Sequence, residues 1–254
     1  MIDPRAVVHP EARLGEGVRV EPFAVIGPEV EIGDHTWIGA HAVVKGPTRI
    51  GAHNKIYQFA SVGEEPQDKK YAGEPTRLEI GDHNVIREYC TINRGTVQDQ
   101  GVTRIGHHNW IMAYVHIAHD CQVGDHTIFA NNASLAGHVT VEDHAILGGF
   151  TLVHQFCRIG AHAFTAMGSA VAKDVPPFLM VAGNPARARG LNQEGLRRRG
   201  FSAEAMACLK RAYREVYRSG RTLGEALAAV RALDCPEARR FADFIAASRR
   251  GVVR

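Results

Sequence analysis

The sequence predicts a mainly β protein in which a parallel β-helix is followed by a small α-helical domain. Two observations support this prediction. An aliphatic residue stands at every sixth position from Ile2 to Val62, a period that neither a helix nor an alternating strand produces. Beyond residue 186 the apolar residues recur at helical spacing, as at Met206 and Leu209. Three hexads make an 18-residue turn whose equivalent side chains stack inward, so the first part of the chain is expected to be a solenoid.

The hexad register also locates two loops and a domain boundary. No repeat is seen over residues 63–79, and the aliphatic positions resume in the register of Val62 at Ile80. Residues 93–104 shift the register by one position, which predicts a second loop. The repeats then continue to Val171 with one lapse, at Thr165. We therefore expect a β-helix domain at 1–186, with loops at 63–79 and 93–104, and a helical domain at 187–254.

The helical domain is expected to contain three or four helices. Capping-box patterns occur at Thr222 with Glu225 and at Asp234 with Glu237. Such pairs satisfy the free N–H groups of a first helical turn. Each pair therefore predicts the start of a helix.

No segment has the features of an export signal or a membrane span. The amino terminus lacks an apolar core of signal-peptide length, and nowhere are there 18 consecutive apolar residues. An odd number of cysteines without a C-x-x-C pair argues against a disulfide framework. We expect a cytoplasmic protein whose five cysteines are buried thiols: Cys90, Cys121, Cys157, Cys208 and Cys235.

The charge is divided unequally between the two domains. Residues 187–254 carry 16 Lys and Arg against 7 Asp and Glu, a balance of +9, whereas residues 1–186 carry 14 against 20. A basic helical domain is where an acidic partner would bind, although a merely solvated surface has the same composition. No nucleic-acid recognition motif accompanies the charge, so a nucleic-acid partner is not expected.

The histidines separate into two sets. Nine of the 14 stand three residues after an aliphatic position, and we interpret these as corner residues that face solvent. Others depart from that pattern and fall into one column, because equivalent residues of successive turns stack one strand spacing apart, about 4.8 Å. The column predicts a polar site that contains His116, His119, Asp120, Gly137, His138, His154 and Gln155, although His138 also fits the corner pattern.

Six separated segments closely resemble the UDP-N-acetylglucosamine acyltransferases, the family that begins lipid A biosynthesis. In order, they are KYAGEPT at 70–76, TINRGT at 91–96, VHIAHDC at 115–121, LAGHV at 135–139, VHQFCRIGAH at 153–162 and EGLRRRGF at 194–201. The resemblance runs over the whole chain. It implies a left-handed parallel β-helix, a homotrimer with active sites between subunits, and transfer of a 3-hydroxyacyl group from acyl carrier protein to the 3-hydroxyl of UDP-N-acetylglucosamine. The hand depends on the resemblance alone, since the hexad period does not fix it.

The resemblance assigns catalysis to three positions. His119 matches the family's catalytic histidine, a general base for the attacking hydroxyl. Asp120 matches the residue that orients this base, and Gly137 matches a position whose N–H meets the oxyanion. Neighbouring side chains of a strand point to opposite sides, so Asp120 reaches His119 only if the backbone turns or if it comes from another subunit. This chemistry needs no metal and no cofactor besides the thioester substrate.

Substrate contacts carry over position by position. The family's contacts to glucosamine match Asp68, His116, His138 and Gln155. Lys70 resembles a contact to the substrate or to phosphopantetheine, and His154 lies in the same column without a clear role. Positions near the uridine diphosphate, where a guanidinium fork suits a phosphate, match Asn192, Glu194, Arg198 and Arg199.

Met167 departs from the family pattern. Members that use long acyl chains have glycine there, and the acyl tail passes that position in the groove between subunits. A thioether side chain therefore predicts a shorter acyl chain. The alternative is that Met167 only fills space at the subunit interface, as methionine often does.

Three other functions are compatible with parts of the pattern. A γ-type carbonic anhydrase would use His116, His119 and His138 as zinc ligands, but it would not explain the first loop or the EGLRRRGF segment. A non-catalytic scaffold would not need a His–Asp pair outside the corner pattern. A related N-acyltransferase usually has an amino-terminal uridine-binding domain, whereas the hexads here start at residue 2. The sequence does not distinguish a 3-hydroxyl from a 3-amino acceptor, and it does not give the acyl length.

Overall fold

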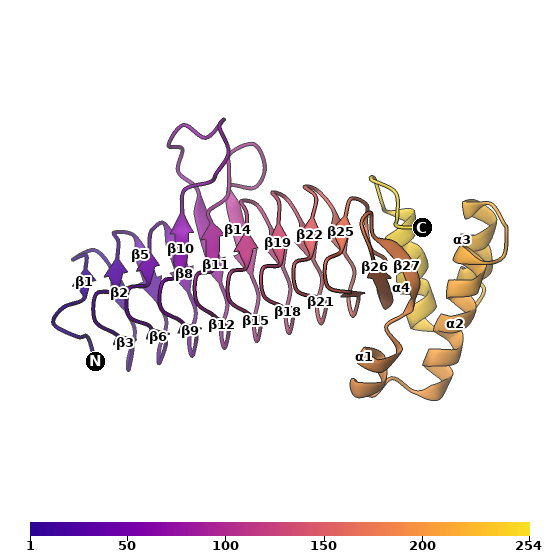
Figure 1. Cartoon of the computed structure of the whole chain (residues 1–254), viewed down its shortest axis with the longest axis horizontal. Coiled ribbons are helices and arrows are strands. Elements are labelled where there is room, and N and C mark those ends of the chain that lie inside the picture. Colours follow the sequence, from indigo (N-terminus) through magenta and orange to yellow (C-terminus); the bar gives the residue numbers. More distant parts are fainter.

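Short parallel strands wind into a three-sided coil that makes up most of the molecule (Figure 1). The computed structural model describes all 254 residues. Every third strand joins the same sheet, so the coil has three sides. We call these sides faces 1, 2 and 3, and we name each corner by the two faces that it joins.

The strands are two to five residues long. Face 1 contains β1 (Val7–Val8), β4 (Val25–Ile26), β7 (Val43–Val44), β10 (Ser61–Glu64), β13 (Thr91–Asn93), β16 (His116–Ile117), β19 (Ser134–Leu135), β22 (Leu152–Val153) and β25 (Ala170–Val171). Face 2 contains β2 (Arg13–Leu14), β5 (Val30–Ile32), β8 (Thr48–Ile50), β11 (Arg77–Ile80), β14 (Val102–Ile105), β17 (Gln122–Val123), β20 (Thr140–Val141) and β23 (Arg158–Ile159). Face 3 contains β3 (Arg19–Val20), β6 (Trp37–Ile38), β9 (Lys55–Ile56), β12 (Val85–Ile86), β15 (Trp110–Ile111), β18 (Ile128–Phe129), β21 (Ile146–Leu147), β24 (Phe164–Thr165), β26 (Leu179–Ala182) and β27 (Arg187–Leu191).

The strand register follows the three-hexad turn. His116 of β16 pairs with Ser134 of β19, and Ser134 pairs with Leu152 of β22. The two exceptions are the longer turns that carry loops. In these turns Ser61 pairs with Thr91, and Thr91 pairs with His116. Both loops therefore leave the coil at corner 1–2, between β10 and β11 and between β13 and β14.

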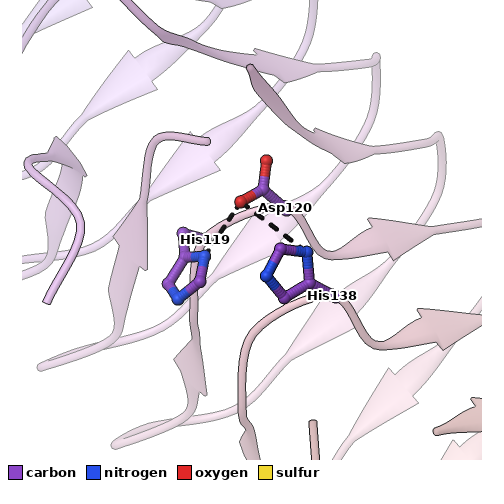
Figure 2. A group of neighbouring side chains, drawn as sticks. All are labelled: His119, Asp120 and His138. Atoms are coloured by element: carbon purple, nitrogen blue, oxygen red, sulfur yellow. Dashed lines mark hydrogen bonds and ion pairs between the residues drawn. The ribbon is translucent and has the colours of Figure 1, made fainter. Parts of the chain in front are cut away.

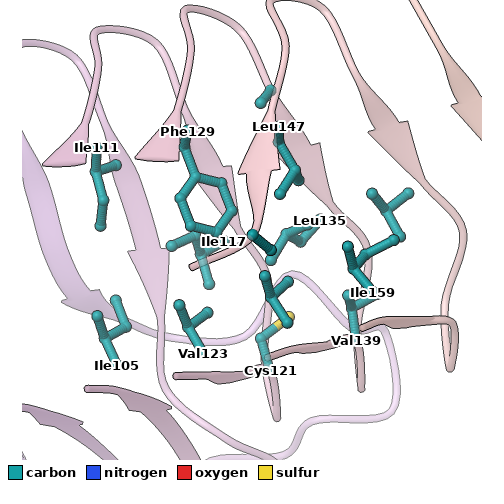
Figure 3. Close-up of a cluster of buried hydrophobic side chains, with 14 of the residues drawn as sticks. Ile105, Ile111, Ile117, Cys121, Val123, Phe129, Leu135, Val139, Leu147 and Ile159 are labelled. Atoms are coloured by element: carbon teal, nitrogen blue, oxygen red, sulfur yellow. The ribbon is translucent and has the colours of Figure 1, made fainter. Parts of the chain in front are cut away.

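The hexad aliphatic residues fill the interior of the coil, as Figure 3 shows for a stretch from Ile105 to Ile159. Ile38, Ile56 and Ile117 are fully buried. Burial of such a side chain contributes roughly 1.5–3 kcal/mol relative to exposure, and this is why the period tolerates so few exceptions. The exception at Thr165 is also buried, and its hydroxyl bonds to that of Thr151 at 2.7 Å.

The corner histidines form a regular stack. Seven of them follow one another along corner 2–3 with ring centroids 4.8–5.1 Å apart. Each has a left-handed backbone with φ between 56° and 60°, a conformation in which histidine is enriched among non-glycine residues. The corner position is therefore confirmed for His35, His53, His83, His108, His126, His144 and His162. Exposure to solvent is confirmed for the first five, whereas His144 and His162 are half-buried.

Four helices follow the hairpin of β26 and β27, as expected: α1 (Gln193–Arg198), α2 (Ala203–Tyr217), α3 (Leu223–Arg231) and α4 (Pro236–Ala246). The capping box of Thr222 and Glu225 starts α3. The one predicted at Asp234 is wrong. Cys235 precedes α4 without a side-chain cap, and Pro236 holds the first helical position, where a missing N–H costs nothing.

The cysteine prediction was wrong for two residues. Cys208 of α2 and Cys235 form a disulfide, which the odd cysteine count did not suggest. Cys90, Cys121 and Cys157 are free and buried as expected. The last residues return to the coil, where Val252 pairs with Asp174. None of the four helices has the length and apolar character that a membrane span requires.

Candidate active site

His119 and Asp120 meet at corner 1–2, directly after β16 (Figure 2). Asp120 has a left-handed backbone with φ of 60°, so the chain turns between the two residues and their side chains lie on the same side. Nδ1 of His119 is 2.9 Å from Oδ2 of Asp120. The predicted pair therefore forms within one chain, through a turn of the backbone.

The second loop holds the Asp120 carboxylate in place. The Thr96 N–H lies 3.0 Å from each carboxylate oxygen, and the Thr96 hydroxyl donates to Oδ2 at 2.6 Å. Asp120 is 2% exposed. Burial alone would raise the pKa of this carboxyl, but the hydrogen bonds from His119 and Thr96 outweigh it and keep the pKa below its ordinary value. A carboxylate only accepts hydrogen bonds, so Nδ1 of His119 carries the proton and Nε2 is free to act as a base.

Gly137 stacks on the ring of His119, as the length of the turn predicted. A β-carbon on Gly137 would lie 2.5 Å from Cε1 and 2.7 Å from Nε2 of that ring. The N–H of Gly137 makes no backbone hydrogen bond in the chain. This position therefore offers a free donor beside the base, which glycine alone permits.

His138 lies one turn above Asp120 and completes the cluster in Figure 2. Its Nδ1 is 2.8 Å from Oδ2 of Asp99 and 3.9 Å from Oδ2 of Asp120. Its ring stacks on Phe156 with centroids 4.4 Å apart and meets His119 edge to face at 5.0 Å. Sequence reasoning missed Asp99, together with Thr96, because both belong to a loop in which the hexad period is lost.

Other predicted residues lie on the same side of the coil. His116 of β16 pairs through Nδ1 with the Thr91 hydroxyl at 2.7 Å, and burial, with a smaller effect from His119, lowers the pKa of His116. His154 and Gln155 follow β22 at the same corner and are exposed. Lys70 and Asp68 belong to the first loop, where the Lys70 N–H donates to the Asp68 carboxylate at 3.0 Å.

The residues predicted near the nucleotide lie elsewhere, at face 3. Asn192, Glu194, Arg198 and Arg199 line a cavity of about 600 Å³ together with apolar residues of β18, β21 and β24. Asn192 caps α1, and its side-chain N–H donates to the His162 carbonyl at 2.9 Å. Glu194 pairs with Arg198 at 2.9 Å. Burial lowers the pKa of Arg199, one of whose guanidinium nitrogens is buried without a partner.

Met167 follows β24 at corner 3–1 and is 77% exposed in the single chain. The predicted site residues thus occupy two sides of the coil. The histidine cluster belongs to corner 1–2, whereas Met167 and the α1 cavity belong to face 3 and its edge. One chain does not bring these two groups into one cleft.

His119, Asp120 and His138 are also the one group of histidine and carboxylate side chains close enough to hold a metal ion, with ligand atoms within 4.8 Å of one another. The Asp120 carboxylate is already engaged by Thr96 and His119. His116, which a zinc site of three histidines would need, is turned to Thr91. The contacts within the cluster therefore suit proton transfer better than metal binding.

A coil of hexapeptide repeats with a histidine–carboxylate pair at one corner is typical of acyl-transferring enzymes of the hexapeptide class. Two family models match the chain. The bacterial transferase hexapeptide model covers residues 29–64 and 103–137, and the model for domain 2 of UDP-N-acetylglucosamine O-acyltransferase covers residues 174–253.

Named relatives span the whole chain. Acyl-[acyl-carrier-protein]–UDP-N-acetylglucosamine O-acyltransferase of Thiobacillus denitrificans is 68% identical and that of Pseudomonas aeruginosa is 64% identical, each over 100% of this chain and 99% of the relative. The chain therefore belongs to the family of acyl-[acyl-carrier-protein]–UDP-N-acetylglucosamine O-acyltransferases.

Solved structures agree with this assignment. UDP-N-acetylglucosamine acyltransferase of Francisella novicida is 43% identical with a TM-score of 0.98, covering 100% of this chain and 94% of that one. The enzyme of Moraxella catarrhalis is 49% identical with a TM-score of 0.97, covering 100% and 99%. The predicted fold class, a left-handed parallel β-helix followed by a small helical domain, is confirmed.

Proposed function

We propose that this protein transfers a 3-hydroxyacyl group from acyl carrier protein to the 3-hydroxyl of UDP-N-acetylglucosamine, the first step of lipid A biosynthesis. Membership of the family supports the reaction. The single observation that supports the mechanism is the His119–Asp120 pair, which engages Nδ1 of His119 and directs Nε2 to the side of the free N–H of Gly137.

The reaction proceeds through addition and elimination at the thioester carbonyl. Nε2 of His119 takes the proton of the sugar hydroxyl as its oxygen bonds to the carbonyl carbon. The resulting oxyanion is stabilised by the Gly137 N–H, and the ionised Asp120 stabilises the imidazolium. When the carbon–sulfur bond breaks, the thiolate takes the proton back from His119. All bonds and protons are accounted for without a metal, a cofactor or a covalent acyl-enzyme.

We further propose a homotrimer that completes the site. The histidine cluster and the α1 cavity lie on different sides of the coil. In a closed ring of three subunits, face 3 of each subunit would meet corner 1–2 of the next. Each of the three interfaces would then bring a histidine cluster and an α1 cavity together. Exposed apolar side chains at corner 3–1, including Phe23, Phe59 and Tyr114, are the kind of surface that such an interface would cover.

The substrates divide between these two sides. Asp68, His116, His138 and Gln155 contact the glucosamine end, and Asn192, Glu194, Arg198 and Arg199 bind the nucleotide end. Lys70 contacts the substrate or the phosphopantetheine, and His154 lies in the same site without an assigned contact. The basic helical domain receives acyl carrier protein, and the reaction takes place in the cytoplasm. Met167 limits the acyl chain.

The test uses the purified enzyme with UDP-N-acetylglucosamine and a ladder of 3-hydroxyacyl and plain acyl thioesters of acyl carrier protein, with products weighed by mass spectrometry. We expect O-acylated sugar nucleotide, and we expect His119→Ala to lose about 10²- to 10⁴-fold in rate while it keeps the wild-type circular dichroism. Parallel reactions with the 3-amino sugar nucleotide test the N-acyltransferase alternative. Near-normal turnover by a folded His119→Ala variant, or zinc bound in a 1:1 ratio and required for activity, would contradict the mechanism.

A further inference from the structure

The second loop contributes a carboxylate to the cluster as well as a threonine. Thr96 holds Asp120, and Asp99 holds His138. Two histidine–carboxylate pairs therefore stand side by side at corner 1–2: His119 with Asp120 at 2.9 Å, and His138 with Asp99 at 2.8 Å. The proposed mechanism uses the first pair only.

The contact with Asp99 determines which nitrogen of His138 is available. A carboxylate accepts and does not donate, so the neutral ring carries its proton on Nδ1. Nε2 then has a free lone pair and can accept a hydrogen bond from a hydroxyl. The His138 side chain is 13% exposed, and its ring is packed flat on Phe156. Water therefore has little access to the ring and does not replace the hydrogen bond to Asp99.

Asp99 also separates the two pairs. The Nδ1 of His138 lies 3.9 Å from Asp120, against 2.8 Å from Asp99. Without Asp99, the nearest carboxylate to His138 is the one that orients His119. A ring turned toward Asp120 would compete with His119 for the same oxygen.

We infer that Asp99 is a positioning residue: it fixes the Nδ1–H tautomer and the orientation of His138, so that Nε2 is presented to a hydroxyl of the acceptor sugar. The inference rests on the proposed function, in which His138 contacts the glucosamine. It predicts that Asp99 acts chiefly on sugar binding, through His138. The proton transfer of His119 is affected less, and only as far as a released His138 ring competes for Asp120.

The test is a double-mutant cycle on the full-length enzyme with Asp99→Ala, His138→Ala and the pair. Loss of one hydrogen bond of this kind corresponds to about a 3- to 10-fold rise in the KM for UDP-N-acetylglucosamine, with a smaller change in kcat. Asp99→Asn should recover most of this loss, because its amide oxygen still accepts from Nδ1. Gln98→Ala, at an exposed neighbour in the same loop, is the matched control and should keep the wild-type KM.

The coupling decides the result. If Asp99→Ala and His138→Ala each raise the KM, and Asp99→Ala adds nothing once His138 is absent, the inference holds. If Asp99→Ala costs as much with His138 absent as with it present, the inference is overturned and the proposed function stands. If His138→Ala leaves the KM unchanged, the sugar contact assigned to His138 is itself wrong. The ¹⁵N shifts of the His138 ring supply a second readout: Nδ1 should be protonated in the wild type and in Asp99→Asn, and the Nε2–H form should gain population in Asp99→Ala.

Discussion

Gly137 lies so close above His119 that the β-carbon it lacks would stand 2.5 Å from Cε1 and 2.7 Å from Nε2 of the imidazole. Gly137→Ala should therefore displace the His119 ring from its position as the general base. Misplacement of a reacting group by about 1 Å can cost about 10²-fold, so we expect kcat to fall by at least that factor. The backbone of Gly137 is not left-handed, and the melting temperature should change little.

Gly27→Ala is the control for this variant, because its β-carbon would meet no atom closer than 3.4 Å. It should retain wild-type activity. Retention of activity by Gly137→Ala would mean that the ring of His119 moves freely and that its observed position is not the reactive one.

Met167→Gly should shift the preferred acyl chain upward by several carbons. Each methylene that fits an open groove contributes about 0.8 kcal/mol, whereas forcing one against a packed side chain costs roughly 1–3 kcal/mol. Met167→Ala should give an intermediate optimum. The measurement is relative kcat/KM for each thioester of the ladder, and a length profile identical in all three proteins would assign Met167 to interface packing.

Salt should raise the KM for acyl carrier protein thioesters. The helical domain carries a balance of +9 over residues 187–254, and Lys210, Arg214 and Arg218 line one cavity of about 710 Å³. Attraction between exposed charges is screened as the Debye length falls from about 10 Å at 0.1 M salt to about 3 Å at 1 M. An acyl-pantetheine thioester, which lacks the acidic protein, should show a weaker dependence. Equal dependence for both donors would leave the basic surface without a docking role.

His162→Phe should make the protein more stable at low pH. Burial, with a smaller contribution from His144, lowers the pKa of His162 to about 4, and its Nδ1 is buried without a partner. A group whose folded pKa is lowered binds more protons in the unfolded state between about pH 4 and 6.5, so stability falls as the pH falls through that range. Phenylalanine already occupies the next position of the stack, at Phe178.

The gain of His162→Phe should be on the order of 1 kcal/mol at pH 5, after allowance for partial solvent screening, and smaller at pH 8. Thermal unfolding at the two pH values measures it. His53→Phe, at an exposed position of the same stack, is the control. A pH-independent difference would assign the effect to packing alone.

Reduction of the Cys208–Cys235 disulfide should destabilise the helical domain. The bond joins residues 27 positions apart, and closing a loop of that size contributes about 3.5 kcal/mol in the chain-entropy treatment. A reducing agent should lower the melting temperature of the wild type and have no effect on Cys235→Ser. Titration of five thiols in the unreduced, unfolded protein would contradict the disulfide.

Much of the site followed from counting residues. One turn beyond His119 lies Gly137, and one turn beyond Asp120 lies His138, because identical turns stack with a fixed register. The left-handed turn at Asp120 was missed, although Asp120 stands three residues after Ile117, the same position in the hexad as the corner histidines that share its positive φ. The contacts of Thr96 and Asp99 could not be predicted, because the loop that carries them has no hexad period and its contacts depend on tertiary packing.

The helical end was less predictable than the coil. The capping box at Thr222 was visible as a local pattern. α4 starts instead at Pro236, after an N-cap residue without a side-chain hydrogen bond. The disulfide of that residue, Cys235, joins it to Cys208, with which it has no local relationship in the sequence.

The register of three hexads per turn restricts how the length of this chain can change. Deletion of one hexad between His119 and Gly137 would rotate every later residue onto the next face, and Gly137 would no longer stand over His119. Insertion of a whole turn would keep all faces and add about 4.8 Å to the axis. The loops between β10 and β11 and between β13 and β14 escape this restriction, since the turns that carry them are longer than the others and still return to register. Length variation among relatives should therefore come in whole turns along the coil and in any number of residues at those two loops.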